Sequence, residues 1–511
     1  MRVLLIGDIG WRDLYHLGDE AMTEVALDSL QARGVTDVTL VGGHPDCASA
    51  RYGVPSIARI GFRGTPDRSH NAARYEAVVD AARSGRRTLP DDDPAIAVIE
   101  AVRTSDAVLV AGGGNLNSFF PQHIFERASL AAVAAVLGKP FALTSQTIGP
   151  LIRRQDEPYL RSLLGPAVGI GARERHTLAS AHAFGAGEGR AASTMDDAFG
   201  LLPRAEDRAS VARYQDEPYI VASFAENPST PSITKDGYYR LAAKTLVELA
   251  DLHRAKVLLV PHAGTFQEGR LVRDQVSNET IAALARDDRV QPTSMLTARE
   301  VAALTQDAAL VVGTRYHPAI FAARTATPAV SLAPTMYSSV RMRGASANVG
   351  LEDYVLDLAS WRSGLVLRAA RELLDDDRAV RAHMTSVRET RIADHEAWWD
   401  ALVPSMKDGQ PITLGECLTP VDSYASPGTW ATAARSLLDE TERHDRQRMT
   451  LKWRIDELER EVRELRRASA ENGGGRKGRR RTRLAKAVRA RLRTAIRRLR
   501  SLRRTGRRQG D

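Results

Sequence analysis

Short apolar runs alternate with longer stretches of helical spacing along the first 200 residues. In the longer stretches, such as residues 18–34 and 128–140, apolar positions recur every three or four residues. The apolar runs predict strands over residues 2–10, 37–43, 106–116, 141–150, 168–174 and 191–201. Buried parallel strands separated by helices are typical of an open α/β sheet. We therefore predict an α/β fold, with a first Rossmann-like domain over residues 1–205.

A second series of the same kind begins near residue 218. Its apolar runs predict strands over residues 218–226, 255–263, 308–317 and 328–334. Helical spacing over residues 235–253 predicts a helix between the first two of these strands. The series predicts a second Rossmann-like domain over residues 215–360. Two successive α/β halves predict two domains that face a shared cleft.

The chain after residue 360 predicts a helical extension. Closing helices are predicted over residues 361–403, and the Pro, Gly, Ser and Thr of residues 404–434 predict a linker. Residues 435–469 carry a short heptad seam, which predicts a coiled coil. The seam consists of Leu451, Ile455, Leu458, Val462 and Leu465. About two heptads of this kind either pair two chains into a homodimer or fold back on their own chain.

Charge is distributed unevenly, and this changes how the C-terminus is interpreted. Residues 473–511 hold 17 Lys and Arg and one acidic residue, whereas the rest of the chain holds 55 basic and 62 acidic residues. This basic tail places apolar residues on one helical face: Leu484, Val488, Leu492, Ile496, Leu499 and Leu502. Arginine density suits anionic lipid or nucleic acid, and the apolar stripe favours a membrane surface over nucleic acid. The alternative is a solvated tail.

Cysteine usage and apolar run lengths bear on compartment and cofactors. Cys47 and Cys417 are the only cysteines, and neither has the spacing of a zinc site or a disulfide framework. Residues 1–10 lack the features of a signal peptide, and no apolar run approaches about 18 residues. We therefore predict a cytoplasmic protein without metal or cofactor, which is peripheral at the inner membrane face if the tail binds lipid.

Polar chemistry gathers where predicted strands end, which is where open α/β sheets bind ligands. Gly112, Gly113 and Gly114 follow an apolar run, and their backbone amides can approach an anion closely. A tight turn explains the same glycines. Asp19 opens the helix that follows the first glycine loop. This residue is either catalytic or a helix-starting acid favoured by the helix dipole.

Two charge-capable residues, Arg315 and His317, follow another apolar run. A guanidinium holds phosphate or carboxylate in bidentate fashion, and an imidazole exchanges protons near neutral pH. The alternative is a structural ion pair with a histidine that caps the following helix. Gln146, Arg173 and Asp196 lie at further strand ends of the same kind. Their joint occurrence favours one shared site for an anionic ligand.

Six motifs, taken as an ordered set, resemble those of the polysaccharide pyruvyl transferase family. They lie within about residues 1–345 and read HLGDEAM, GGGNL, QTIGP, GARERHT, TMDDAF and GTRYHPAIFAARTATPAV. The family usually has asparagine where this chain has His16. It often has tyrosine and then lysine where MYSSVR offers Tyr337 and Arg341, which preserves charge but not shape. The chain from residue 404 onward lies outside the resemblance.

The resemblance implies a GT-B-like fold and a transferase activity. Members of the family transfer a pyruvyl group from phosphoenolpyruvate to two hydroxyls of a sugar. The acceptor is expected to be a cell-surface glycan or its lipid-linked precursor, and the products are a pyruvate ketal and phosphate. The family's RxH motif, which binds phosphoenolpyruvate, maps onto Arg315 and His317. A GT-B-like glycosyltransferase with a nucleotide-sugar donor is the alternative.

The donor's chemistry assigns expected roles to the residues of these motifs. Phosphoenolpyruvate carries a phosphate and a carboxylate, so its site needs several cations and amide donors. The predicted substrate-binding residues are Arg315, Arg173, Gly112, Gly113, Gly114, Gln146, Tyr337 and Arg341. His317 is the candidate for proton transfer or phosphate contact. Asp196 or Asp19 is expected to orient or deprotonate the sugar hydroxyl, and this chemistry requires no metal.

Overall fold

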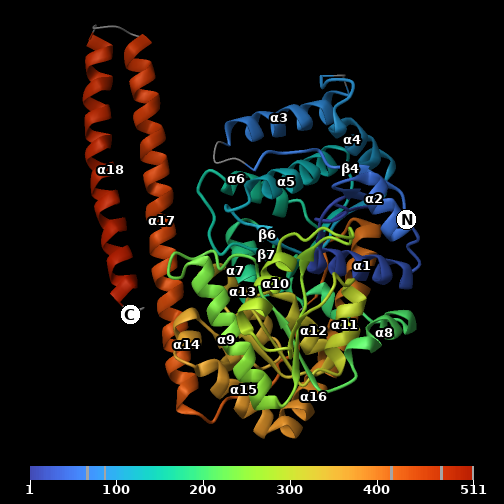
Figure 1. The fold of residues 1–511 in the computed structure, drawn as a ribbon. Coiled ribbons are helices and arrows are strands. Elements are labelled where there is room, and N and C mark those ends of the chain that lie inside the picture. The colour runs from blue at the N-terminus through green and yellow to red at the C-terminus, as the bar shows by residue number, and fades with distance from the viewer. Residues whose placement is uncertain (65–67, 86–87, 415–417, 472–475, 509–511) are drawn as a thin grey trace.

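Two parallel sheets, one in each half of the chain, organise the computed structural model (Figure 1). The structure describes all residues except 65–67, 86–87, 415–417, 472–475 and 509–511. Of the two cysteines, Cys417 lies outside the described residues, and Cys47 is a partly buried free thiol.

The first sheet has the order β4-β3-β1-β5-β7-β8-β9, with β6 paired to β7. Its strands are β1 (Arg2–Ile6), β3 (Asp37–Gly42), β4 (Ser56–Ala58), β5 (Ala107–Val110), β6 (Gly113–Leu116), β7 (Phe141–Ile148), β8 (Gly169–Ala172) and β9 (Ala191–Ser193). The single strand predicted over residues 106–116 is wrong. The chain leaves the sheet after β5, and β6 begins at Gly113, opposite Gln146 of β7. This break places the glycine run at the carboxyl end of the sheet.

Helices cover both faces of this sheet. They are α1 (Leu17–Ala32), α2 (Pro45–Tyr52), α3 (Ser69–Ser84), α4 (Pro94–Thr104), α5 (Pro121–Val136), α6 (Glu157–Leu164) and α7 (Arg175–Ala183). The helix predicted over residues 128–140 starts earlier, because Pro121 occupies the first turn of α5, where its missing N–H costs nothing. The strand predicted over residues 191–201 is likewise shorter, since a 3-10 turn, η1 (Asp197–Gly200), follows β9.

The second sheet has the order β13-β11-β10-β14-β15-β16, and every pairing is parallel. Its strands are β10 (Tyr219–Ser223), β11 (Lys256–Leu259), β13 (Val290–Pro292), β14 (Leu310–Gly313), β15 (Ala329–Leu332) and β16 (Val355–Leu356). Its principal helices are α8 (Ala205–Val211), α9 (Lys235–His253), α10 (Asp274–Ala285), α11 (Ala298–Gln306), α12 (His317–Thr325) and α13 (Met336–Ala347). The short turns η2 (Ala212–Tyr214) and η3 (Glu352–Tyr354) complete it.

A short antiparallel ladder joins the two domains directly before α1. In this ladder β2 (Tyr15–His16) pairs with β12 (Ala263–Gly264). The Leu17 amide then donates to the carbonyl of His262 over 3.0 Å. The second domain therefore fixes the backbone from which the first helix of the first domain starts.

The closing helices return the chain to the first domain. After α14 (Leu358–Arg362) and α15 (Leu365–Asp375), the long helix α16 (Asp377–Asp408) buries Trp398 and Trp399 in the core beneath the first sheet. The Trp398 indole N–H donates to Thr144 Oγ1 over 2.9 Å. Because α16 continues through Pro404 to Asp408, the linker predicted from residue 404 begins as helix. Its next segment also packs, since the Ile412 amide donates to the Val168 carbonyl over 2.7 Å.

Two long helices, α17 (Thr429–Glu471) and α18 (Arg476–Arg508), form an antiparallel hairpin beside the two domains (Figure 1). Their apolar seam contains Leu458, Val462, Val488 and Ala495, with Ile455, Leu465 and Leu492 partly buried against it. The heptad seam is thus used within the chain. Of the predicted apolar stripe of the tail, Val488 and Leu492 pack against α17. Leu484 of the stripe is instead 51% exposed, whereas its neighbour Ala485 is buried.

The hairpin contacts both domains through α17. Its Asp445 accepts a hydrogen bond from the Met336 amide of the second domain over 3.0 Å. In the first domain, Arg153 forms an ion pair with Asp456 at 3.1 Å, and the Trp453 ring lies 5.7 Å from that of Phe119. No helix within the described part of the chain is long and apolar enough to cross a membrane.

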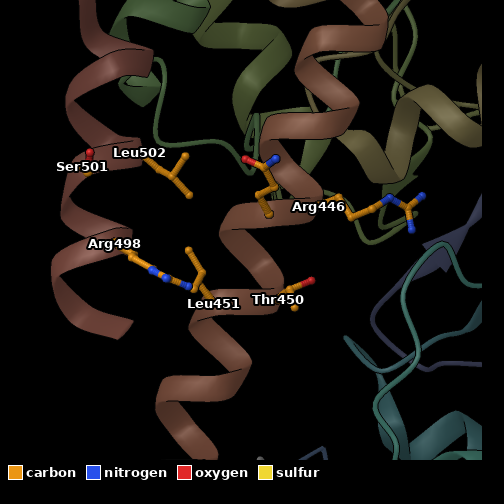
Figure 2. Close-up of a pocket in the computed structure, with 7 residues that line it drawn as sticks. Arg446, Thr450, Leu451, Arg498, Ser501 and Leu502 are labelled. Carbon is orange, nitrogen blue, oxygen red and sulfur yellow. The ribbon is translucent and has the colours of Figure 1, made fainter. Parts of the chain in front are cut away.

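A groove opens between α17 and α18 near the end of the hairpin seam (Figure 2). Leu451 and Leu502 point toward each other across it. The lining residues are Arg446, Gln447, Thr450, Leu451, Arg498, Ser501 and Leu502. None of them belongs to the motifs at the strand ends, so the groove is separate from the candidate site.

Candidate functional site

Two helix N-termini meet where the two domains touch. His317 is the first residue of α12, and Gly18 is the second residue of α1. A Cβ atom on Gly18 would lie 1.9 Å from His317 Nδ1, so only glycine lets the imidazole pack against the start of α1. Helix N-termini carry partial positive charge and favour anions. The junction is therefore suited to an anionic ligand before any side chain is considered.

The His317 imidazole is partly buried, with 16% of its side chain exposed, and lies near three arginines. Burial lowers its pKa well below the ordinary value, and Arg173, Arg341 and Arg315 lower it further. Its Nε2 atom has no hydrogen-bond partner and lies 3.9 Å from Asp196 Oδ2. At neutral pH the ring is neutral. It can accept a proton or a hydrogen bond, but it holds no proton that is easily given away.

The guanidinium of Arg173 lies just after β8 and is 1% exposed. Its Nη1 donates to Asp196 Oδ2 over 2.5 Å, and its Nε donates to Thr147 Oγ1 over 2.8 Å. Asp196 also accepts from the Ala198 amide over 2.9 Å and so caps η1. The ion pair between Arg173 and Asp196 therefore holds both predicted site residues in place. Asp196 has little freedom left to deprotonate a hydroxyl.

The glycine run lies against the cations of the site. A Cβ on Gly114 would lie 2.7 Å from Arg341 Nη1 and 2.8 Å from Arg173 Nη2. The Tyr337 hydroxyl donates to the Gly114 carbonyl over 2.5 Å. A glycine is required there because two guanidinium groups approach the backbone. This close approach explains the glycine better than a tight turn does.

Gly112 and Gly113, the other two glycines of the run, contact residues of the first domain. A Cβ on Gly112 would lie 2.5 Å from the Met22 sulfur, and Gly113 pairs with Gln146 in the sheet. The fully buried Gln146 side chain donates to the backbone carbonyls of Ala111 and Thr144 over 2.8 and 2.7 Å. Gln146 therefore shapes the glycine run from beneath it.

The partner of Arg315 is a carboxylate. Its Nε donates to Asp274 Oδ2 over 2.8 Å, and its Nη2 donates to the other carboxylate oxygen. Asp274 starts α10 and also accepts from the His262 and Ala263 amides over 3.1 and 3.0 Å. The structural ion pair considered for Arg315 is thus present, and the guanidinium side chain remains 31% exposed. Nothing in the sequence around Asp274 marks it as this partner.

Arg341 is the site cation without a carboxylate. Its guanidinium lies over the Tyr337 ring at 4.0 Å and the Tyr316 ring at 5.2 Å. Among the described residues, no acidic side chain forms an ion pair with it within 4.0 Å. Aromatic faces stabilise a cation while leaving its N–H donors available. Arg341 is therefore the most available cation for an incoming anion.

Asp19 differs from the other carboxyl groups of the junction. Burial raises its pKa to about 8, and the nearby Asp8 carboxylate acts in the same direction. The side chain is partly exposed and makes no hydrogen bond to any described residue. At neutral pH it is mostly a protonated acid, which is the state required of a general acid. Asp8, which adds to the effect of burial, lies two residues after the end of β1, where the strand-end rule expects ligand-binding groups, although it belongs to none of the six motifs.

Metal ligation has no candidate cluster in the described ranges. No group of three or more His, Cys, Asp or Glu side chains there is arranged to hold a metal ion. The site's positive charge comes from guanidinium groups and helix N-termini.

Comparison with known proteins adds a family and a fold. The family described as polysaccharide pyruvyl transferase matches residues 16–335, more than half of the chain. No curated protein matches the sequence. Two solved structures resemble the fold: a Listeria monocytogenes protein titled as a UDP-N-acetylglucosamine 2-epimerase, and the Neisseria meningitidis UDP-GlcNAc 2-epimerase bound to UDP-GlcNAc.

The extent of this structural likeness is similar in both cases. The Listeria structure has a TM-score of 0.53 and 12% identity, covering 81% of this chain and 99% of its own. The Neisseria structure has a TM-score of 0.51 and 10% identity, covering 80% of this chain and 100% of its own. At this identity the likeness concerns the fold alone. It confirms the predicted pair of Rossmann-like domains in a GT-B-like arrangement.

Proposed function

Because the chain belongs to the polysaccharide pyruvyl transferase family, we propose that it transfers a pyruvyl group from phosphoenolpyruvate to a sugar. The acceptor is a cell-surface glycan or its lipid-linked precursor. The product is a pyruvate ketal on two sugar hydroxyls, and phosphate is released. The single observation that carries the proposal is Arg341, a cation with no carboxylate partner among the described residues, beside Arg173 and the Gly114 backbone.

The donor's two anionic groups match the distribution of positive charge. Arg341 and the Nη2 side of Arg173 converge on Gly114, and the α1 and α12 N-termini meet at His317. Arg315 contributes its exposed edge beyond the pair with Asp274. A phosphate and a carboxylate together need several such donors. These groups form the proposed phosphoenolpyruvate site.

The protonation states support a division of labour. Asp19 delivers its proton to the methylene carbon of phosphoenolpyruvate, and the adjacent carbon becomes electrophilic. A sugar hydroxyl attacks that carbon while neutral His317 accepts the hydroxyl proton. A second hydroxyl then displaces phosphate, which leaves with the bridging oxygen and the second proton. The raised pKa keeps Asp19 protonated before the reaction, and the lowered pKa keeps His317 neutral.

The test is release of phosphate from phosphoenolpyruvate in the presence of sugar acceptors. Arg341→Ala is expected to lower kcat/KM for phosphoenolpyruvate at least about 100-fold, since a charge-assisted contact is lost. Arg240→Ala, which removes an exposed arginine from α9, serves as the control. Phosphate release that needs a nucleotide-sugar, or that Arg341→Ala leaves unchanged, contradicts the proposal.

A further inference from the structure

A second polar cluster lies in the first domain, close to Asp19. Its centre is Asp8, whose Oδ1 accepts from Arg59 Nη2 over 2.6 Å and from the Trp11 indole over 3.3 Å. Its Oδ2 accepts from Asn115 Nδ2 over 3.3 Å. Burial raises the pKa of Asp8, but Arg59 and the neighbouring histidines and arginine lower it below its ordinary value overall. The cluster therefore presents a fixed carboxylate.

Hydrogen bonding sets the tautomer of His123 in this cluster. The Arg127 guanidinium can only donate, and its Nη1 lies 3.3 Å from His123 Nδ1. The ring proton therefore sits on Nε2, which lies 3.7 Å from Asp8 Oδ2. This distance is too long for a hydrogen bond. An N–H donor and a carboxylate acceptor thus stand side by side, each able to bond a third group.

Two side chains next to Asp8 and His123 also have polar atoms without a hydrogen-bond partner among the described residues. Asn115 is 9% exposed, and its Oδ1 has no hydrogen-bond partner. The guanidinium of Arg127 is 1% exposed, and no carboxylate of a described residue forms an ion pair with it within 4.0 Å. Burial lowers the pKa of Arg127 to about 10, and Arg59 acts in the same direction. Buried polar atoms of this kind normally have partners, so the cluster lacks a ligand with donors and acceptors.

An exposed aromatic ring borders the same cluster. Phe120 is 42% exposed, lies edge-on to His123 at 6.3 Å, and lies 6.5 Å from the Tyr337 ring of the donor site. A flat apolar face beside a few fixed polar groups is the arrangement that binds sugars, whose rings have a C–H face and hydroxyl edges. A hydroxyl can accept from His123 Nε2 and donate to Asp8 Oδ2 together.

We propose that Asp8, Asn115 and His123, with the exposed face of Phe120, form the acceptor subsite and bind the hydroxyls of a pyranose. The subsite rests on the proposed function, because Asp19 and Tyr337 place it beside the donor site. Asp8 and His123 position the hydroxyls, and the proton transfers belong to Asp19 and His317.

The test compares acceptor and donor parameters in matched variants. The probes are p-nitrophenyl glycosides of galactose, mannose and N-acetylglucosamine, with phosphoenolpyruvate as donor. Phe120→Ala is expected to raise the acceptor KM about tenfold, and Asp8→Asn about 10- to 100-fold, while the KM for phosphoenolpyruvate stays within about twofold. Asp13→Asn, in the same loop but exposed, is the control. Unchanged acceptor KM in both variants overturns the subsite.

A binding measurement separates this proposal from the proposed function. Saturation-transfer NMR of the same glycosides, without phosphoenolpyruvate, reports on the subsite alone. Signals that weaken in Phe120→Ala and Asp8→Asn support the subsite even if phosphoenolpyruvate is not a substrate. Glycosides that do not bind the wild-type protein, or bind both variants equally, contradict it. Phe120→Ala keeps the comparison valid if Asp8→Asn fails to fold, because an exposed ring contributes little to the core.

Discussion

The arginines of the domain junction and those of α18 differ in burial and in their ion-pair partners. Arg173 is buried and bonded to Asp196, and Arg315 is bonded to Asp274. On α18, no ion pair within 4.0 Å joins any of seven described cations to a carboxylate of a described residue, although α17 beside it is rich in acidic residues. These cations are Lys486, Arg489, Arg491, Arg493, Arg497, Arg498 and Arg500.

The difference follows from solvation. A buried cation with fixed partners, such as Arg173, keeps its geometry before a ligand arrives. An exposed cation needs no partner, is screened by salt and moves with its side chain. The junction is therefore suited to orienting a small anion, whereas α18 is suited to weak contact with an extended one.

The largest expected effect comes from breaking a buried pair. Arg173→Ala leaves Asp196 and Glu174 buried without their cation, which is expected to cost about 3–5 kcal/mol of unfolding free energy. Phosphate release is expected to fall below detection, because the Gly114 side of the donor site loses a cation. Urea unfolding and the phosphate assay measure the two effects. If Arg173→Ala unfolds with the same free energy as the wild-type protein, buried and exposed arginines do not differ in the way argued above.

Asp19 tests a second consequence of burial at the domain junction, because its carboxyl group stays mostly protonated at neutral pH. Asp19→Asn is expected to lower kcat by about 10²- to 10⁴-fold. The folded-state pKa of about 8 lies above the ordinary value, so ionising Asp19 costs stability as pH rises from about 4 to 8. The asparagine variant is therefore expected to gain stability relative to wild type over this range, as measured by urea unfolding at pH 5 and pH 8. A pH-independent difference would contradict the raised pKa.

Local patterns predicted much of the fold, and contacts between distant segments account for what they missed. The strand-end motifs follow from apolar runs and helical spacing, which neighbouring residues determine. Gly18 packing on His317, and Arg315 bonding Asp274, depend on how two domains dock. The pKa of His317 is lowered first by burial and then by Arg173, Arg341 and Arg315, which lie in three separate segments. No short window of sequence contains that information.

The hairpin illustrates the same limit. The tail's apolar stripe was visible in the sequence, but its periodicity fits a membrane surface and a partner helix equally well. The structure places Val488 and Ala495 against Leu458 and Val462. This packing depends on the antiparallel arrangement of α17 and α18, which the periodicity of the stripe does not specify.

The smallest expected effect on turnover belongs to the α18 arginines. Replacing Arg491, Arg493, Arg497, Arg498 and Arg500 together by glutamine is expected to change kcat less than about twofold, because none touches the junction. Binding to vesicles that contain anionic lipid remains a prediction. It is expected to weaken in this variant at low salt, at about 1 kcal/mol per lost charge near the surface.

Salt reversal then decides how the hairpin meets a membrane. With Val488 and Leu492 packed on α17, we expect charge to dominate binding. The wild-type protein is therefore expected to leave anionic vesicles as ionic strength rises toward about 1 M, where the Debye length is about 3 Å. Vesicle cosedimentation across a salt series measures this. Wild-type protein that stays bound at high salt would mean that Val488 and its neighbours had left α17 for the bilayer. The arginines of α18 would then be part of an inserted amphipathic helix, and the contrast with the junction would rest on burial in lipid rather than on exposure to water.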